Sequence, residues 1–452
     1  MLKITTAALV AYPLAITLLT GTGSALANDV ALTQIEQLGE KIFFDETLSI
    51  NQNQACASCH DPDVGWTSPN SEINAHGAVF QGSVDGEFGN RKPPSSAYAT
   101  QSPNFHADFG NRLLGDDKEE LTNDPRFVGG NFVDGRATGW KLGNPAADQA
   151  QAPFLNPVEQ GLPDAACVVY RVCKGEYARL FDKVWTPNAC GITWATDIED
   201  QCKDIDGVVA LSPQDRKKVD NAYDRVTLSI AAFEGSKASN AFTSRLDAIR
   251  ASRGAIPFTP EEKMGHDLFE LHCISCHAGA RGPGDALPLL TDYSFWNLGV
   301  PRNPENPHSM NNPKWKDPGL GGFLKSVKGF TRYAKANDGK HKVTTIRNVG
   351  LGSCEAEDAE GCIVKAYMHN GYFKSLKSVM HFYNTRDTLA SCESIGFDNA
   401  TEDVALANNC WPEPEIAKNV ETATMGDLGL TEEEEDAVVT FMLIMSDGYI
   451  EK

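Results

Sequence analysis

Two short motifs of one kind constrain this chain more than any other feature of its sequence. The segments 56–60 and 273–277 both read C-x-x-C-H. This pattern is typical of c-type haem attachment, in which two thiols bond to the porphyrin and the adjacent imidazole binds its iron. One copy alone could be half of a zinc site, but two copies behind an export signal predict two covalent haems. The residues concerned are Cys56, Cys59, His60, Cys273, Cys276 and His277.

The first 27 residues have the composition of a secretory signal peptide. Lys3 supplies a positive start, an apolar run follows from Ile4 to Leu19, and residues 25–27 read A-L-A, a small-x-small cleavage site. A membrane anchor would need about 20 apolar residues, whereas this run is shorter and contains Pro13. We therefore expect the mature chain to begin near Asn28 and to be exported to the periplasm, or beyond it.

The chain contains 12 cysteines, of which the two motifs use four. An even number of remaining cysteines in an exported chain indicates disulfides. The sequence does not determine how they pair, so the expectation rests on the nearest neighbours. These pairs are 167–173, 190–202, 354–362 and 392–410.

The composition is acidic, with 61 Asp and Glu residues against 40 Lys and Arg and a formal net charge of −21. Such a chain repels nucleic acid and anionic membranes, and it attracts a basic or dipolar redox partner. The same charge also keeps an exported protein in solution. It therefore argues against nucleic-acid binding without naming a partner.

Helix signals outnumber strand signals along the chain. An amphipathic stretch, 33–43, leads to the first motif, and 259–271, which opens with T-P-E-E, leads to the second. An apolar stripe predicts a long helix over 213–234, and T-E-E-E begins a last helix that ends near Met445. The fold class expected is mainly α with long loops.

The order of helix and motif occurs twice, which indicates two cytochrome-c-like domains with one covalent haem each. The expected domains are residues 28–250 and 258–452, after a signal peptide at 1–27. The boundary is placed near Arg250–Pro257 because this stretch contains Gly and Pro and has no hydrophobic periodicity.

Several stretches around the motifs form a recognisable set. They read V-D-G-R-A at 133–137, Q-A-Q-A-P at 149–153, N-P-V-E at 156–159, I-R-N-V at 346–349 and A-Y-M-H-N-G at 366–371, with Leu376 after them and His76 sixteen residues after His60. Together they resemble the bacterial dihaem cytochrome c peroxidase / MauG superfamily, over residues 33–160 and 259–446. The resemblance implies that the first haem meets peroxide and that the second transfers electrons.

Two polar residues stand where the family keeps its catalytic groups at the first haem. Glu159 matches the distal glutamate and Gln149 the distal amide, although Gln151 lies nearby. Heterolysis of peroxide needs a group that takes a proton from one oxygen and returns it to the other, and burial raises the pKa of a carboxyl group toward the range where it can do both. The alternative for Glu159 is a solvated carboxylate in a loop.

Three positions bear on the iron ligands that the resemblance implies. His76 matches a histidine that occupies the sixth site of the resting first haem in the peroxidases, and the alternative is an exposed loop histidine. Tyr383, fourteen residues after His369, matches the sixth ligand of the second haem, which is Met in the peroxidases and Tyr in MauG. Met380 is its rival because it lies three residues earlier on the same helical face. His369 itself matches a histidine beside the second haem, where it meets a propionate.

The sequence departs from the family at two places. The Trp that the family keeps between the haems is Val133 here, and Trp140 could replace it in space. The family's inter-haem calcium takes an Asn after an Arg, but the residue after Arg91 is Lys92. An ammonium group cannot ligate Ca²⁺, whose ligands are oxygens, so calcium is doubtful and Lys92 is expected to take its place.

The resemblance predicts a periplasmic peroxidase that reduces hydrogen peroxide with electrons from a small cytochrome c or cupredoxin. One alternative is a MauG-like oxidase that modifies residues of a partner protein. Another is a dihaem electron carrier without turnover, but a carrier would not need Glu159. The oligomeric state is left open.

Overall fold

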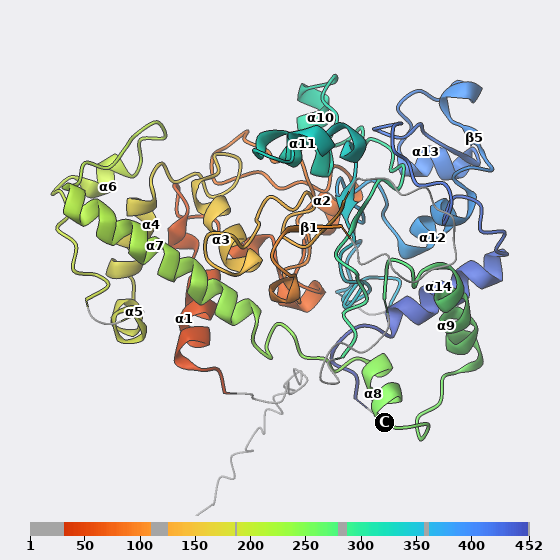
Figure 1. The fold of residues 1–452 in the computed structure, drawn as a ribbon, viewed down its shortest axis with the longest axis horizontal. Helices are drawn as coiled ribbons and strands as arrows, with labels where there is room; N and C mark the ends of the chain where they lie inside the picture. The colour runs from red at the N-terminus through yellow and green to blue at the C-terminus, as the bar shows by residue number, and fades with distance from the viewer. Residues whose placement is uncertain (1–30, 110–124, 186–187, 279–286, 357–360, 451–452) are drawn as a thin grey trace, which may run out of the picture. The chain divides into compact units, whose positions relative to one another are not determined.

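Helices make up most of the regular structure of this chain. The computed structural model describes residues 31–109, 125–185, 188–278, 287–356 and 361–450 (Figure 1). The expected signal peptide, 1–27, lies outside the described residues. Contacts between Cα atoms join residues 32–452 into one compact unit, and the division into two domains at 250–258 stays a prediction.

The mainly helical class predicted from the sequence is confirmed. The strands within the described ranges form three two-stranded sheets, β1–β2 and β3–β4 antiparallel and β5–β6 parallel. The helices are α1 (Gln34–Phe43), α2 (Ser71–Ala75), α3 (Pro145–Leu155), α4 (Ala165–Lys174), α5 (Ala178–Val184), α6 (Ile198–Gln201), α7 (Pro213–Glu234), α8 (Arg245–Ala251), α9 (Pro260–His272), α10 (Pro307–Asn311), α11 (Gly319–Ser326), α12 (Leu376–Thr385), α13 (Glu402–Ala407) and α14 (Glu432–Leu443), and the strands are β1 (His106–Asp108), β2 (Arg126–Val128), β3 (Phe295–Trp296), β4 (His341–Lys342), β5 (Ala390–Ser391) and β6 (Cys410–Trp411).

The capping residues define where the predicted helices begin. Thr259 and Thr431 form capping boxes at the start of α9 and α14, and the Ser212 side chain caps α7. Each cap satisfies a backbone N–H that has no partner inside the helix. The last helix ends at Leu443, two residues before the expected Met445.

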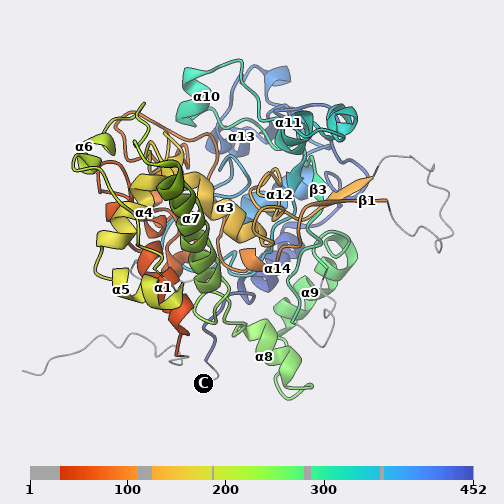
Figure 2. The ribbon, with the colours of Figure 1, turned by 60° about the vertical axis from the view of Figure 1, so that its left-hand side comes forward.

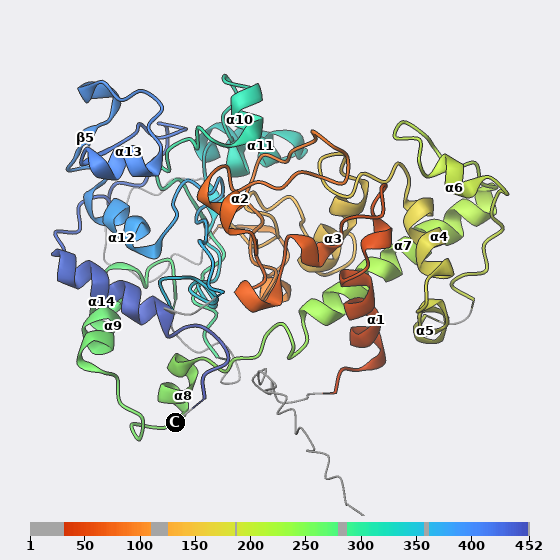
Figure 3. The ribbon, with the colours of Figure 1, turned by 180° about the vertical axis from the view of Figure 1, so that it is seen from behind.

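Each motif follows a helix that crosses a second helix at a glycine. α1 packs on α7, and α9 packs on α14 (Figures 1 and 3). A Cβ atom on Gly39 would lie 1.9 Å from the carbonyl oxygen of Ser229, and one on Gly265 would lie 1.9 Å from that of Ala437. Only glycine permits such a close approach of two backbones, so the same helix crossing occurs before both motifs.

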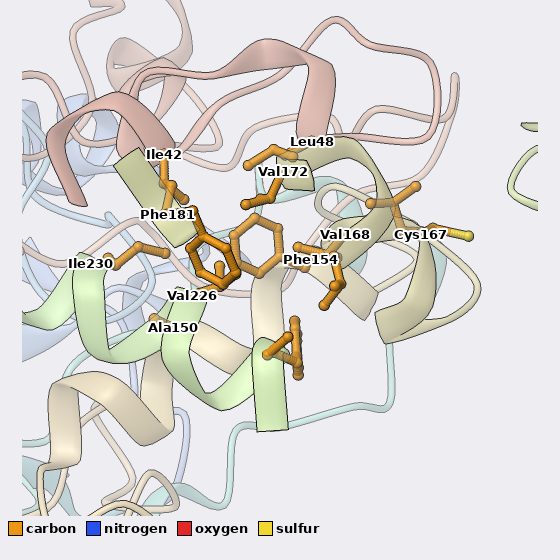
Figure 4. Packing of buried hydrophobic residues seen from close by; sticks show 14 of the residues in the cluster. Ile42, Leu48, Ala150, Phe154, Cys167, Val168, Val172, Phe181, Val226 and Ile230 are labelled. Carbon is orange, nitrogen blue, oxygen red and sulfur yellow. The ribbon is translucent and has the colours of Figure 1, made fainter. Parts of the chain in front are cut away.

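The largest apolar cluster lies around α7, which also packs against α3 and α4 (Figure 2). Phe154 of α3 and Phe181 of α5 meet Val226 and Ile230 of α7, and all four side chains are at most 2% exposed (Figure 4). Burying side chains of this size stabilises the fold by about 1.5–3 kcal/mol each. This cluster supports the wall that carries the first motif.

Four disulfides join the eight remaining cysteines. Two nearest-neighbour predictions, 354–362 and 392–410, are confirmed, whereas 167–173 and 190–202 are wrong. Cys167 and Cys173 both lie in α4, and residues six apart on a helix point in different directions. Each therefore bonds to a partner in the loop segment that returns along α4, and the pairs are Cys167–Cys202 and Cys173–Cys190.

None of the helices in the described ranges combines the length and the apolar character that crossing a bilayer requires.

Candidate functional site

The first motif lines a cavity of about 230 Å³. A 3-10 turn, η2 (Cys56–Ser58), tightens the chain, so that the backbone N–H groups of Cys59 and His60 both donate to the carbonyl of Cys56 at 3.1 and 3.0 Å. All three motif side chains line the cavity, together with Gln149 and Glu159. The structure therefore brings the first motif and both candidate catalytic residues to one site.

The second motif lines a cavity of about 300 Å³. Helix α9 ends at His272, and the chain then turns as it does at the first motif, because the N–H of His277 donates to the carbonyl of Cys273 at 2.9 Å. The motif side chains Cys273, Cys276 and His277 line this cavity. The local backbone design is the same at the two sites.

The two motif histidines are oriented by one kind of hydrogen bond. Nδ1 of His60 lies 3.2 Å from the carbonyl oxygen of Trp66, and Nδ1 of His277 lies 2.9 Å from that of Leu290. Burial lowers the pKa of His60 to about 4 and also lowers the pKa of His277. Each imidazole is therefore neutral at pH 7, donates through Nδ1 and keeps Nε2 for a metal, as iron-binding histidines do.

The four motif cysteines are free thiols, while the other eight are bonded in pairs. Burial raises the pKa of Cys59 to about 12 and that of Cys273 to about 12. These groups are neutral thiols, the species that adds across a vinyl group to make a thioether. The cavities therefore offer the attachment chemistry that a c-type haem requires.

Glu159 is a half-buried residue that lines the first cavity. Asn156 donates to its Oε2 from Nδ2 at 3.0 Å, and burial raises its pKa above the ordinary value in spite of this bond. The interpretation as a solvated loop carboxylate does not fit this burial. Gln149 of α3 lines the same cavity, whereas Gln151 is held outside it by Asp224 and accepts a hydrogen bond from Lys141.

Arg136, within the V-D-G-R-A stretch, was not identified as a functional residue from the sequence. Its guanidinium carbon lies 3.6 Å from the centroid of the Phe132 ring, and its side chain pairs with Asp134 at 2.7 Å. It lines the first cavity, and its charge opposes the effect of burial on the pKa of Glu159. Arg136 is thus a positive charge that acts on the candidate acid–base group.

His76 does not line either cavity. It caps the end of α2, its side chain is 66% exposed, and its Nδ1 lies 3.1 Å from Oε1 of Glu305. Binding to iron in the first cavity would require His76 to leave Glu305 and the segment around it to move. Its role as an iron ligand stays a prediction.

Both candidates for the sixth ligand of the second site project from α12 into the second cavity. Met380 is 2% exposed, and Tyr383 is held in surroundings that raise its pKa by burial. Both residues line the cavity that contains His277. Either Tyr383 or Met380 can therefore be the sixth ligand, and the assignment to Tyr383 stays a prediction.

His369 and His341 stack in the wall of the second cavity. Their ring centroids lie 3.6 Å apart with an angle of 13° between the rings. Nε2 of His341 lies 3.6 Å from Oδ2 of Asp317, and Nε2 of His369 lies 3.5 Å from Oε2 of Glu415. Both imidazoles therefore face carboxylates at the cavity wall, and the contact of His369 with a haem propionate stays a prediction.

Val133 lines both cavities and thus occupies the position between them. Trp140, considered as a spatial replacement for the family's tryptophan, is 53% exposed and lines neither cavity. Its indole N–H donates to the carbonyl of Phe105 at 2.9 Å, and its ring packs on Phe105 and Phe330. The structure gives Trp140 the contacts of a loop anchor.

Arg91 and Lys92 are neighbours in the sequence, but their side chains bind different partners at the wall between the cavities. Arg91 donates to both oxygens of Asp317 at 2.6 and 2.7 Å, and to Asp134 at 2.6 Å. Nζ of Lys92 donates to the carbonyl of Pro93 at 2.9 Å and to Oγ1 of Thr67 at 3.2 Å. The ammonium group of Lys92 therefore donates hydrogen bonds to oxygen atoms of the kind that would bind a calcium ion.

Comparison with known families finds a match to the model for di-haem cytochrome c peroxidase over residues 33–254. Among curated proteins, the chain is 29% identical over 440 residues to the methylamine utilization protein MauG of Paracoccus denitrificans, covering 96% of this chain and 94% of that protein. It is 26% identical to the cytochrome-c peroxidase IdrP2 of a Pseudomonas species, covering 77% of this chain and 72% of that protein.

Comparison with solved structures finds the fold of the dihaem peroxidase BthA from Burkholderia thailandensis. The TM-score is 0.64 at 23% identity, and the match covers 91% of this chain and 86% of that one. A MauG-like protein associated with microbial copper homeostasis matches with a TM-score of 0.52 at 18% identity, covering 93% and 91%. At these identities the structures support the fold.

Proposed function

Because the chain belongs to the dihaem cytochrome c peroxidase / MauG family, we propose that it is a periplasmic peroxidase that reduces hydrogen peroxide with electrons from a small redox protein. The family makes it an oxidoreductase and implies two c-type haems. The observation that carries the proposal is that Glu159, whose pKa is raised by desolvation, lines the cavity that also contains His60.

The residues present fit two covalent haems. Each cavity presents two neutral thiols and one imidazole whose Nδ1 bonds to a carbonyl oxygen. We assign attachment at the first cavity to Cys56, Cys59 and His60, and the second to the corresponding residues at 273–277. The bound iron supplies the redox chemistry that divides the oxygens of peroxide.

The chain's own groups supply proton transfer and positioning. Glu159, when deprotonated, takes a proton from one oxygen of peroxide and returns it to the other as this oxygen leaves as water. Asn156 holds one carboxylate oxygen and leaves the other available. We assign to the Gln149 amide the orientation of peroxide. The overall reaction, H₂O₂ + 2 e⁻ + 2 H⁺ → 2 H₂O, takes both electrons from the redox partner.

A second candidate function is favoured by Tyr383. A tyrosine, as in MauG, in place of methionine at the far wall of the second cavity would favour oxidised iron, because a phenolate is a hard anionic donor. The protein would then act as a MauG-like oxidase on residues of a partner protein. This candidate uses the same first cavity and the same Glu159.

Peroxide titration separates the two candidates. A peroxidase of the ordinary kind is expected to need reduction of the second haem before it reacts, and then to oxidise two equivalents of a reduced small cytochrome c or cupredoxin per peroxide. A MauG-like enzyme is expected to react with peroxide in the fully oxidised form. Optical and EPR spectra of the oxidised and half-reduced protein report which form reacts, and failure of both forms to react contradicts the proposed function.

The disulfides support the proposed export to the periplasm. Four disulfides are stable in an oxidising environment such as the periplasm. The net charge of −21 suits a basic or dipolar electron donor rather than a nucleic acid.

A further inference from the structure

Three lysines border the cavities without a carboxylate partner, and of these Lys365 is buried while Lys92 and Lys342 are half-buried. Lys92 and Lys342 line both cavities, and Lys365 lines the second one only. Within the described residues, none of the three forms an ion pair. Burial lowers the pKa to about 8 for Lys92, to about 7 for Lys342 and to about 7 for Lys365.

An unpaired ammonium group in a protein interior is unfavourable unless other groups compensate it. Asp134 acts on Lys342 only from beyond ion-pair distance, and Glu355 acts in the same way on Lys365. Lys92 and Lys365 also repel each other. An anionic group of a bound cofactor at this wall would compensate such lysines and keep them protonated.

The hydrogen bonds divide the three lysines into two kinds. An ammonium group has three N–H donors. Lys365 uses all three, since it donates to the carbonyls of Val64, Asn348 and Leu351 at 2.9, 3.2 and 3.0 Å. Its donors are therefore satisfied without a ligand.

Lys342 keeps one donor for a ligand. It donates to the carbonyl of Gly130 at 2.6 Å and to Oδ1 of Asn131 at 2.9 Å, which leaves one of its three N–H groups without an acceptor in the described residues. Lys92 is in the same state, with Pro93 and Thr67 as its two acceptors. The two lysines with a spare donor are also the two that face both cavities.

We propose that Lys92 and Lys342 are positioning residues that hold carboxylate side groups of both haems from the wall shared by the two cavities, while Lys365 only fastens the chain. The inference rests on the proposed function in that both cavities must hold haem. It adds a shared electrostatic element between the two redox centres, which the sequence motifs do not contain.

If the charge of Lys342 acts on both haems, its loss should change both reduction potentials. A positive charge near a redox centre favours its reduced state, and in a low-dielectric interior this effect is stronger than in water. Lys342 lies at the border of both cavities, so loss of its charge should shift both haem couples toward the oxidised form. The expected shift is about tenfold in each equilibrium constant, or about 59 mV for a one-electron couple.

The test is spectroelectrochemistry of the holoprotein, after haem content has been measured. Lys342→Met is expected to lower both reduction potentials. Lys342→Arg should keep both potentials close to those of the wild-type protein, because arginine keeps the positive charge. Lys365→Met is the matched control, a buried cation lost from the second cavity alone, and it should leave the first potential unchanged. Lys374, whose pKa burial lowers to about 8, lines neither cavity, so Lys374→Met should change neither potential.

The outcomes are distinguishable. If Lys342→Met holds two haems and shifts one potential or none, the inference is wrong and the proposed function stands. If Lys342→Met does not fold, Lys92→Met and Lys342→Gln test the same joint shift. If the wild-type protein contains no covalent haem, the proposed function and this inference both fail.

Discussion

The two cavities share one design on the side that carries the motif. In both, a helix crosses a partner helix at a glycine, the chain turns onto the carbonyl of the first cysteine, and a carbonyl oxygen accepts from Nδ1 of the histidine. The shared features concern only how a haem would be attached and held. They do not distinguish what each haem would do.

The opposite walls differ. The first cavity presents Glu159 and Gln149, which suit proton transfer, and the second presents Met380 and Tyr383, which suit direct binding to iron. The comparison teaches that the motif sides share one local geometry, and that any division of function between the two sites must come from residues far from the motifs. The predictions below test the shared side first and the different sides next.

The largest effect is expected from the shared side. Wild-type protein should contain two c-type haems per chain, measured as the pyridine haemochrome, and haem should stay with the chain on a denaturing gel. Replacing all four motif cysteines, Cys56, Cys59, Cys273 and Cys276, by Ala should remove covalent attachment at both sites. Replacing the two cysteines of one motif should leave the other site loaded, because the two cavities have separate thiols. One haem in the wild-type protein, or haem extractable by acid, would contradict the duplicate design.

Glu159→Gln tests the wall of the first cavity. The change keeps the volume but loses proton acceptance, so peroxide turnover should fall by about 10²-fold or more, measured by oxidation of a reduced donor. Haem content and the spectrum of the second site should stay as in the wild-type protein. Turnover near the wild-type rate would remove Glu159 from the mechanism.

The pH dependence of turnover sharpens the same test. Only deprotonated Glu159 accepts a proton, and burial raises its pKa. Turnover of the wild-type protein should therefore fall as the pH decreases through this raised pKa, above the range of an exposed glutamate. Glu159→Gln should lose this acidic limb and keep a flat profile there, and a limb that persists in the variant would belong to another group.

The wall of the second cavity is tested by spectroscopy. If Tyr383 is the sixth ligand, Tyr383→Phe should change the spectrum of the second haem, while Met380→Leu should leave it nearly unchanged. A methionine-to-iron charge-transfer band at the red end of the ferric spectrum, lost in Met380→Leu and kept in Tyr383→Phe, would reverse the assignment. That result would return the protein to the ordinary peroxidases and remove the main support for the MauG-like candidate.

Local features of the fold could be predicted from the sequence. The apolar stripe predicted both ends of α7. The capping threonines predicted the ends of α9 and α14 to within two residues. Two disulfides between neighbouring cysteines of the sequence were also predicted. The other two pairings depend on how a loop returns along α4, which separation in sequence does not encode.

Features that depend on contacts between distant segments were missed. Lys342 and His341 follow each other in β4 without any motif, and their place at the cavity walls depends on segments about 200 residues away, such as Gly130. Gln149 was chosen from the resemblance, whereas its place in the cavity depends on which side of α3 faces that cavity. A basic residue and a histidine beside a recognised stretch at 346–349 were the only signals available.

The smallest effect is expected at the wall between the cavities, where Lys92 is predicted to replace calcium. Its ammonium group already donates to Pro93 and Thr67. The one His, Cys, Asp and Glu cluster of the described residues with metal-binding spacing contains Asp317, but Arg91 covers both of its oxygens. EDTA should therefore leave activity and both haem spectra unchanged, and metal analysis should find less than one Ca²⁺ per chain. If a tightly held calcium were lost together with activity on chelation, and if adding calcium restored the activity, a metal ion and not the ammonium group of Lys92 would occupy the wall between the two cavities.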